Sequence, residues 1–278
     1  MNYCSYYGGF FDYKDDLVGY HGQDYMSIGQ FVFLFIAILT IILISVFLRK
    51  IEHKKIDKFL KVLAIIIPVL EVTKIIVESY FDIKYHGSFN FSGLLPLYTC
   101  SLFIYTLPLA AFAKGKVKEC CLAFLTTISI FAGMTNFIMA AILLTYPFFN
   151  FHTFVSLNFH FWMVFVGVFL ISTKYYVPKW KDVIKGFIPV ACLSLIVIPI
   201  DYIFKWDYMM YRDGWGCPDF IRNLAKSLGE KGLLFIYTLI VFIAYFLIGA
   251  IIVSVIRLIC YLKGKIQNNK KKLEANLE

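Results

Sequence analysis

The sequence places a potential nucleophile and a potential base in separate apolar segments. Cys100 follows Tyr98 and Thr99 in the run "LPLYTC", and His160 lies in a different apolar stretch. A histidine that takes the proton of a cysteine thiol produces a thiolate, which can attack an ester or thioester carbonyl. Tyr98, Thr99 and Asn136 are candidate donors to the oxyanion that forms in such an attack. This chemistry requires that Cys100 and His160 face each other.

The composition is that of a membrane protein. Of the 278 residues, 60% are hydrophobic and 16% are charged, and the mean hydropathy is +0.74. A helix needs about 20 apolar residues to cross ~30 Å of hydrocarbon. The sequence therefore predicts an all-α, polytopic membrane protein with seven transmembrane helices, near residues 28–48, 62–80, 93–113, 120–146, 152–173, 184–204 and 232–256. Because only "YPFFNF" separates the fourth span from the fifth, broken or re-entrant helices stay open there.

The basic residues predict the orientation of these spans. Cytoplasmic connections of membrane proteins are enriched in lysine and arginine. Of the 27 basic residues, 19 follow the first, third, fifth and seventh spans, 7 lie on the other side, and Lys74 lies within the second span. This distribution predicts an outer N-terminus and a cytoplasmic C-terminus. It also accounts for the net charge of +9, so we expect membrane lipids and not nucleic acid as partners.

Three regions are expected along the chain. Residues 1–27 form an extracytoplasmic segment that lacks the basic start and cleavage site of a signal peptide. Residues 28–257 form the seven-helix membrane domain, and residues 258–278 a basic cytoplasmic tail that we expect to be solvated and partly disordered. We expect the aromatic loop at 205–231 to cap an outward-facing polar cavity of the domain, because its aromatic residues suit the outer membrane interface.

The cysteines and one histidine on the outer side leave further possibilities open. Of seven cysteines, Cys4 and Cys217 share the predicted outer side, where they are either free or joined in a disulfide. No CxxC spacing indicates a zinc site. His152 lies near the outer end of the fifth span, where we expect it to face water.

Polar side chains of four predicted helices fall in one layer. Counted at 1.5 Å per residue from the outer helix ends, the depths are about 10 Å for Cys100, 12 Å for His160, 14 Å for Glu71 and 15 Å for Asn136. Neighbouring helices run in opposite directions, so equal depth does not follow from sequence order. We infer a shared polar cavity that opens outward, in which Lys74 neutralises Glu71 from the same helix face.

Each of these residues also has a purely structural explanation. Cysteine packs as a small hydrophobic residue in membrane helices, so Cys100 need not be reactive. Glu71 and Lys74 fit a structural ion pair, and Asn136 fits a hydrogen bond across a helix interface. His160 is harder to explain in this way, because hydrocarbon offers no partner to its ring nitrogens.

The motif "LPLYTCSLF" at 95–103 resembles the LPL-x-x-CS signature of bacterial YwaF-type integral membrane proteins. Glu71, the patch from Gly133 to Asn136, His160 and "DYMMY" at 207–211 resemble the same family in order and spacing. That family is similar to the transmembrane protein 164 family of phospholipid acyltransferases, and more distantly to the androgen-induced membrane hydrolases. The resemblance implies that Cys100 accepts an acyl group and that His160 is its partner.

These observations predict a plasma-membrane acyltransferase that acts on membrane lipids without a metal or other cofactor. Its catalytic residues would be Cys100 and His160, and the predicted substrate-binding residues are Tyr98, Thr99, Asn136, Glu71 and Lys74. An alternative is a non-enzymatic transport or binding protein that holds a small polar solute at mid-membrane with Glu71, Lys74, Asn136 and His160. A structural or assembly protein without a site is a third possibility, and the sequence leaves the oligomeric state undetermined.

Overall fold

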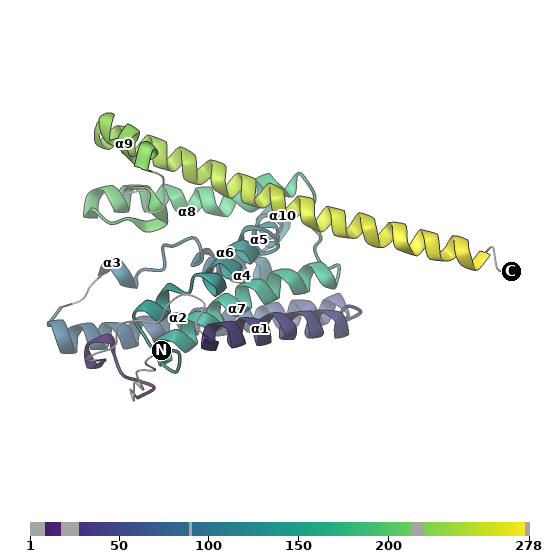
Figure 1. The fold of residues 1–278 in the computed structure, drawn as a ribbon, viewed down its shortest axis with the longest axis horizontal. Helices are drawn as coiled ribbons and strands as arrows, with labels where there is room; N and C mark the ends of the chain where they lie inside the picture. Colours follow the sequence, from purple (N-terminus) through teal and green to yellow (C-terminus); the bar gives the residue numbers. More distant parts are fainter. Residues whose placement is uncertain (1–8, 18–27, 89–90, 213–218, 276–278) are drawn as a thin grey trace.

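The computed structural model of the chain describes residues 9–17, 28–88, 91–212 and 219–275. Every regular element within these residues is helical, which confirms the predicted all-α class (Figure 1). Cys4 and Cys217, for which the sequence left a disulfide open, lie outside the described residues. The elements are η1 (Lys14–Asp16), α1 (Ile28–Phe47), α2 (His53–His86), α3 (Phe91–Leu94), α4 (Leu102–Phe112), α5 (Gly115–Leu125), α6 (Ile128–Ile138), η2 (Ala141–Leu144), α7 (Phe151–Ser172), α8 (Asp182–Phe204), η3 (Tyr208–Met210), α9 (Asp219–Ser227) and α10 (Gly229–Ala275).

Five helical stretches in the described part of the chain are long and apolar enough to cross a membrane. They correspond to the first, fourth, fifth, sixth and seventh predicted spans: Ile28–Phe47, Gly115–Leu144, Phe151–Ser172, Asp182–Phe204 and Gly232–Asn269. Residues 62–80 do form a helix within α2, but Glu71, Lys74 and Glu78 make it less apolar than these five. Length and composition thus support five of the seven predicted membrane crossings. Crossings at residues 62–80 and 93–113 stay predictions.

Contacts between connections show that the basic residues gather at one end of the helices. Asp57, near the start of α2, accepts a hydrogen bond from Tyr175 after α7 (2.5 Å) and lies 3.4 Å from the ammonium group of Lys118 in α5. Lys185 in α8 pairs with Glu119 in α5. Three basic connections that are distant in the sequence therefore meet, and we call the end of the molecule around Asp57 the basic end.

The N-terminal segment closes the opposite end. Tyr13 donates a hydrogen bond to Asp82 near the end of α2 (2.7 Å), and Asn150 donates one to the carbonyl of Asp12 (2.8 Å). Since α2 contains both Asp57 and Asp82, it runs from one end of the molecule to the other. The 25 residues between them correspond to about 38 Å of helix, more than the thickness of the hydrocarbon core.

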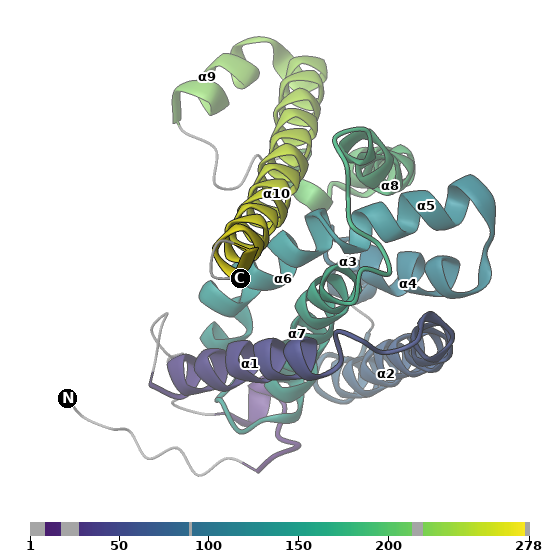
Figure 2. The ribbon, with the colours of Figure 1, turned by 90° about the vertical axis from the view of Figure 1, so that its right-hand side faces the viewer.

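Helix α7 lies at the centre of the fold. It contacts α1 and α2 on one side and α5 and α6 on the other, as Figure 2 shows. Glycines permit this close approach: a Cβ at Gly167 would lie 2.5 Å from the carbonyl oxygen of Leu125, and one at Gly133 would lie 2.6 Å from a methyl group of Val164. Close helix packing through small residues replaces the hydrophobic driving force that hydrocarbon does not supply.

The fourth predicted span is interrupted between α5 and α6. The Thr126 hydroxyl donates to the carbonyl of Leu122 (2.8 Å) and the Thr127 hydroxyl to that of Ala123 (2.5 Å), and both threonines are fully buried. Gly186 of α8 packs against this break, where an added Cβ would lie 2.8 Å from the Thr127 hydroxyl. The break is tolerated because side chains and a neighbouring helix cover the freed backbone groups.

The C-terminal helix differs from the expected tail. Helix α10 continues unbroken to Ala275 and projects beyond the other helices at its C-terminal end (Figure 1). Residues 257–269 are exposed, in agreement with a solvated segment, but they are helical where partial disorder was predicted.

We expect Gly167→Ala to destabilise the protein by about 1–3 kcal/mol, because the new methyl group meets the backbone of α5, which cannot move aside as a side chain can. Gly249→Ala is the matched control, since its Cβ would lie 3.5 Å from Val183, an ordinary contact. The control should be neutral or stabilising by up to about 1 kcal/mol. Equilibrium unfolding in mixed micelles measures both, and equal stability of the two variants would contradict the packing described.

Candidate functional site

The candidate nucleophile Cys100 lies in an irregular turn and not within a helix. Helix α3 ends at Leu94, before Pro96, and α4 begins only at Leu102. The residue before a proline is disfavoured in the helical conformation, which explains the interruption. The prediction of one continuous helix over 93–113 is therefore wrong, and so is a depth for Cys100 counted along it. Turns with hydrogen bonds from Ser101 to Tyr98 (3.0 Å) and from Phe103 to Cys100 (3.0 Å) lead into α4 instead.

His160 is buried in α7 with one ring nitrogen engaged. Its Nδ1 lies 2.7 Å from the carbonyl oxygen of Ser156, one turn earlier in the helix. A carbonyl only accepts hydrogen bonds, so the proton of the neutral imidazole is assigned to Nδ1 and the lone pair to Nε2. Nε2 is buried and has no hydrogen-bond partner among the described residues. The structure therefore presents a buried imidazole whose basic nitrogen is unengaged.

An ion pair from α2 borders the same region. The Lys74 ammonium lies 2.7 Å from a Glu71 carboxylate oxygen, and the Glu71 side chain is only 9% exposed. Lys74 is within electrostatic range of both the Cys100 thiol and the His160 imidazole. Glu71 is within electrostatic range of Cys100 as well. Lys74 thus acts on groups from the turn before α4 and from α7, and the shared polar cavity inferred from the sequence stays a prediction.

The turn around Cys100 is also anchored to α7. Phe103, one turn into α4, packs edge-on against Phe159 with ring centroids 5.7 Å apart, and Phe159 precedes His160. Cys100 is partly buried, and it packs against the main hydrophobic core. In the described part of the chain no hydrogen bond joins Cys100 to His160. Contacts between Phe103 and Phe159 therefore join the two segments, but Cys100 and His160 lack the hydrogen bond that proton transfer needs.

Two of the three predicted oxyanion donors, Thr99 and Tyr98, contact residues other than Cys100. The Thr99 hydroxyl forms a hydrogen bond with Tyr245 of α10, and the Tyr98 ring packs edge-on against Tyr208 at 4.8 Å. Asn136 has a buried side-chain oxygen without a hydrogen-bond partner in the described structure. Thr99 and Tyr98 therefore fix the turn that carries Cys100, whereas Asn136 keeps an unused polar atom.

The segment after α8 covers this turn. Tyr208 donates a hydrogen bond to the carbonyl of Ser92 (2.5 Å), and Tyr211 is hydrogen-bonded to Ser194. Both tyrosines are fully buried: Tyr208 attaches the "DYMMY" segment to the chain before α4, and Tyr211 attaches it to α8. The first part of the 205–231 loop thus packs over the Cys100 turn, and residues 213–218 lie outside the described structure.

Two features of this region escaped the sequence reasoning. Tyr245 was treated only as part of an apolar span, and nothing in its sequence surroundings distinguishes it from the other aromatic residues. His152 does not face water as expected: it is 2% exposed, lies 3.4 Å from Glu78 and stacks on Tyr146 with ring centroids 4.4 Å apart. The N-terminal segment covers it through Tyr13, a contact that could not be foreseen from the position of His152 near a helix end.

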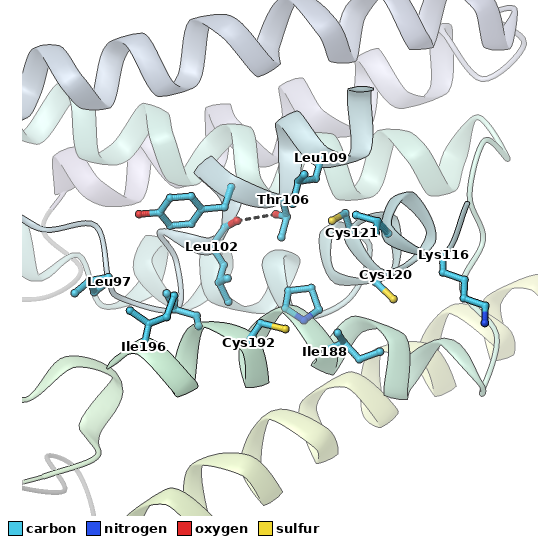
Figure 3. Close-up of a pocket in the computed structure, with 14 residues that line it drawn as sticks. Leu97, Leu102, Thr106, Leu109, Lys116, Cys120, Cys121, Ile188, Cys192 and Ile196 are labelled. Atoms are coloured by element: carbon cyan, nitrogen blue, oxygen red, sulfur yellow. Dashed lines mark hydrogen bonds between the residues drawn. The ribbon is translucent and has the colours of Figure 1, made fainter. Parts of the chain in front are cut away.

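An apolar groove of about 500 Å³ begins beside the Cys100 turn and follows α4, α5 and α8. Figure 3 shows Leu97 and Ile196 toward one end, Lys116 at the other, and Cys120 and Cys192 between them. Leu97 and Leu102 line the groove and flank Cys100 in the sequence. Among the described residues, no group of three or more histidine, cysteine or acidic side chains could hold a metal ion.

We expect Lys74→Met to destabilise the protein by about 3 kcal/mol, because it leaves the buried Glu71 carboxylate without its counter-charge. The double variant Glu71→Gln/Lys74→Met should recover most of that loss, since neither charge is then buried alone. Unfolding in mixed micelles measures this double-mutant cycle. Strictly additive effects of the two substitutions would show that the ion pair does not couple them.

The model of the TMEM164 family matches residues 25–250, a range that contains all the candidate site residues. No curated protein and no solved structure matches the chain. The match confirms the relation to the transmembrane protein 164 family that the "LPLYTCSLF" motif suggested, while the YwaF-type assignment is not confirmed. The chain therefore belongs to the TMEM164 family, a family assignment consistent with its multi-pass membrane character.

Proposed function

We propose that the protein is an acyltransferase of the plasma membrane that moves acyl chains between membrane lipids through a thioester on Cys100. The observation that carries this proposal is the unengaged, buried Nε2 of His160, whose neighbour Lys74 also acts electrostatically on the Cys100 thiol. A structural histidine would be expected to satisfy both ring nitrogens, because an unpaired buried polar atom costs about 1–3 kcal/mol. A general base needs an unprotonated nitrogen that no other group engages before the substrate binds.

In the first half of the reaction, His160 Nε2 takes the proton of the Cys100 thiol and the thiolate attacks the ester carbonyl of a lipid. The ester bond breaks, the leaving alcohol receives the proton from His160, and the acyl group remains on sulfur as a thioester. Because no hydrogen bond joins Cys100 and His160 in the described structure, substrate entry must bring the two groups together. In the second half, His160 takes the proton of a lipid hydroxyl, whose oxygen attacks the thioester carbonyl. The carbon–sulfur bond breaks, the new ester leaves, and the Cys100 thiolate regains the proton from His160.

The surroundings supply electrostatic support for these steps. The ammonium of Lys74 attracts negative charge that develops on the Cys100 sulfur. Glu71 holds that ammonium in place, although its own carboxylate opposes the same charge. The candidate donors to an oxyanion are the amide N–H of Asn136 and the hydroxyl of Tyr98, since the Thr99 hydroxyl is engaged by Tyr245. The unpartnered side-chain oxygen of Asn136 only accepts hydrogen bonds, so it does not serve in this role. The roles assigned here to Lys74 and Glu71 are electrostatic and positioning roles, not proton transfer.

The apolar groove along α4 suits the acyl chain of such a substrate. Its lining is almost wholly hydrophobic, and it starts at Leu97 and Leu102 on either side of Cys100. A chain bound there would place its carboxyl end near the turn that carries the thiol. Hydrocarbon around the groove also limits the access of water, which favours transfer to a lipid over hydrolysis of the thioester.

We expect the purified protein in native lipid to carry an acyl adduct on Cys100 that hydroxylamine removes. Intact-protein mass spectrometry should show the adduct in the wild type and in Cys260→Ala, a control at an exposed cysteine of α10, and not in Cys100→Ala. His160→Gln should slow formation of the adduct by about 10²- to 10⁴-fold, as loss of a general base does.

An adduct that persists in Cys100→Ala would exclude the thioester mechanism. The absence of any adduct, combined with normal folding of all variants, would favour the alternative in which Glu71, Lys74, Asn136 and His160 hold a polar solute. Uptake or binding should then fail in Glu71→Gln and survive in Cys100→Ala.

A further inference from the structure

A second pocket of about 540 Å³ opens at the basic end of the molecule, away from Cys100. One wall is the first part of α2, and the other is the connection from α4 to α5. The lining residues are mostly lysines, together with one acidic residue and the apolar end of α4: Lys54, Asp57, Lys58, Lys61, Ala111, Phe112, Ala113, Lys114 and Lys118.

The lysines of this pocket lie on two segments that face each other. Lys54, Lys58 and Lys61 are spaced i, i+4 and i+7, so they lie along one face of α2. Lys114 faces them from the start of α5. These four lysines are exposed and form no ion pair within the described structure, so their ammonium groups are available to a ligand.

The fifth lysine of the pocket, Lys118, pairs with Asp57, the one acidic residue that lines it. Asp57 lies 3.4 Å from Lys118, and its other contact is the hydrogen bond from Tyr175 (2.5 Å). Partial burial opposes ionisation of Asp57, but Tyr175 and the nearby lysines outweigh it and lower the pKa of the carboxyl group. Asp57 therefore neutralises Lys118 and ties α2, α5 and the segment after α7 together, while the four other lysines stay uncompensated.

The enrichment of basic residues at cytoplasmic ends explains how many lysines are present, but it does not require them to converge on a cavity. Convergence is what recognition of an anion requires. Compact, strongly hydrated ammonium groups suit the charge of a phosphate group. The exposed ring of Phe112 and the two alanines beside it add an apolar surface at the edge of the membrane, next to the start of the predicted span at residue 62.

We propose that this pocket binds the phosphate group of an anionic phospholipid from the adjacent leaflet, with the glycerol and upper acyl region of the lipid against Phe112. The apolar edge formed by α4 favours a lipid over a soluble phosphate, because a soluble phosphate has no apolar part that could contact this edge. Basic pockets between membrane helices are known to bind phosphate-bearing lipid headgroups. The site is separate from the proposed acyl-transfer centre and does not depend on it.

The test is native mass spectrometry of the full-length protein in detergent micelles with added dioleoylphosphatidic acid. The triple variant Lys54→Gln/Lys58→Gln/Lys61→Gln should bind this lipid about 100-fold more weakly than the wild type, from roughly 1 kcal/mol per lysine near a lipid phosphate and about 1.4 kcal/mol per tenfold. Dioleoylphosphatidylcholine, whose headgroup has no net charge, should bind weakly to both.

The matched control is Lys55→Gln/Lys263→Gln/Lys265→Gln, which removes the same charge at three exposed lysines outside the pocket. It should bind dioleoylphosphatidic acid as the wild type does. Replacement of the three pocket lysines by arginine should also preserve binding, which separates loss of charge from loss of fold.

Three outcomes would overturn the proposal. An equal loss in the control variant would mean that general charge, and not the pocket, attracts the lipid. Unchanged binding in the glutamine variant of the pocket would place the lipid elsewhere. Sodium pyrophosphate that binds to the wild type in lipid-free detergent, competes with the lipid and is lost in the pocket variant would reassign the site to a soluble phosphate.

Discussion

Every polar group within hydrocarbon must find its partner inside the protein, and this constraint organises the structure of the chain. The ion pair between Glu71 and Lys74 is the clearest case, because each charge is tolerable in α2 only while the other is present. The break between α5 and α6 obeys the same constraint through the hydroxyls of Thr126 and Thr127. Irregular backbone survives at these depths because helices and side chains cover it.

In the candidate site, two buried polar atoms have no hydrogen-bond partner within the described structure. The Ser156 carbonyl engages one nitrogen of His160 and thereby orients the ring, but the other nitrogen is left without a partner in a buried position. The side-chain oxygen of Asn136 is unengaged as well. Buried hydroxyls without a partner occur elsewhere in the described structure, for example at Ser129 and Thr153, but the unpartnered atom of His160 is a basic nitrogen, which a substrate can engage.

Helix α4 lies between the two proposed lipid sites. Its first residue, Leu102, lies at the Cys100 turn, and its last, Phe112, lies in the lysine-lined pocket, about 15 Å away along the helix. The apolar groove runs along one side of α4 and α5, toward α8, and the basic pocket lies on the side of α2. One short helix thus separates a surface suited to an acyl chain from a surface suited to a phosphate group.

The sequence alone determined the properties that depend on composition and local pattern. Hydrophobic content and run length gave the helical membrane class and five of the spans, and the distribution of basic residues correctly grouped the connections that meet at Asp57. The spacing of Glu71 and Lys74 also indicated their ion pair, because residues three apart share one face of a helix, whereas the depth counted for Cys100 was wrong because no helix spans that residue.

Only the tertiary structure decided what each side chain contacts. The turn at Cys100 replaced an expected helix because Pro96 and the packing of Tyr208 favour irregular backbone there, which an apolar run does not reveal. The engagement of Thr99 by Tyr245, the burial of His152 under Tyr13 and the convergence of lysines on one pocket all join residues far apart in the chain. Hydropathy and charge counts describe how segments partition into a membrane, whereas such contacts depend on how the helices are rotated and packed against one another.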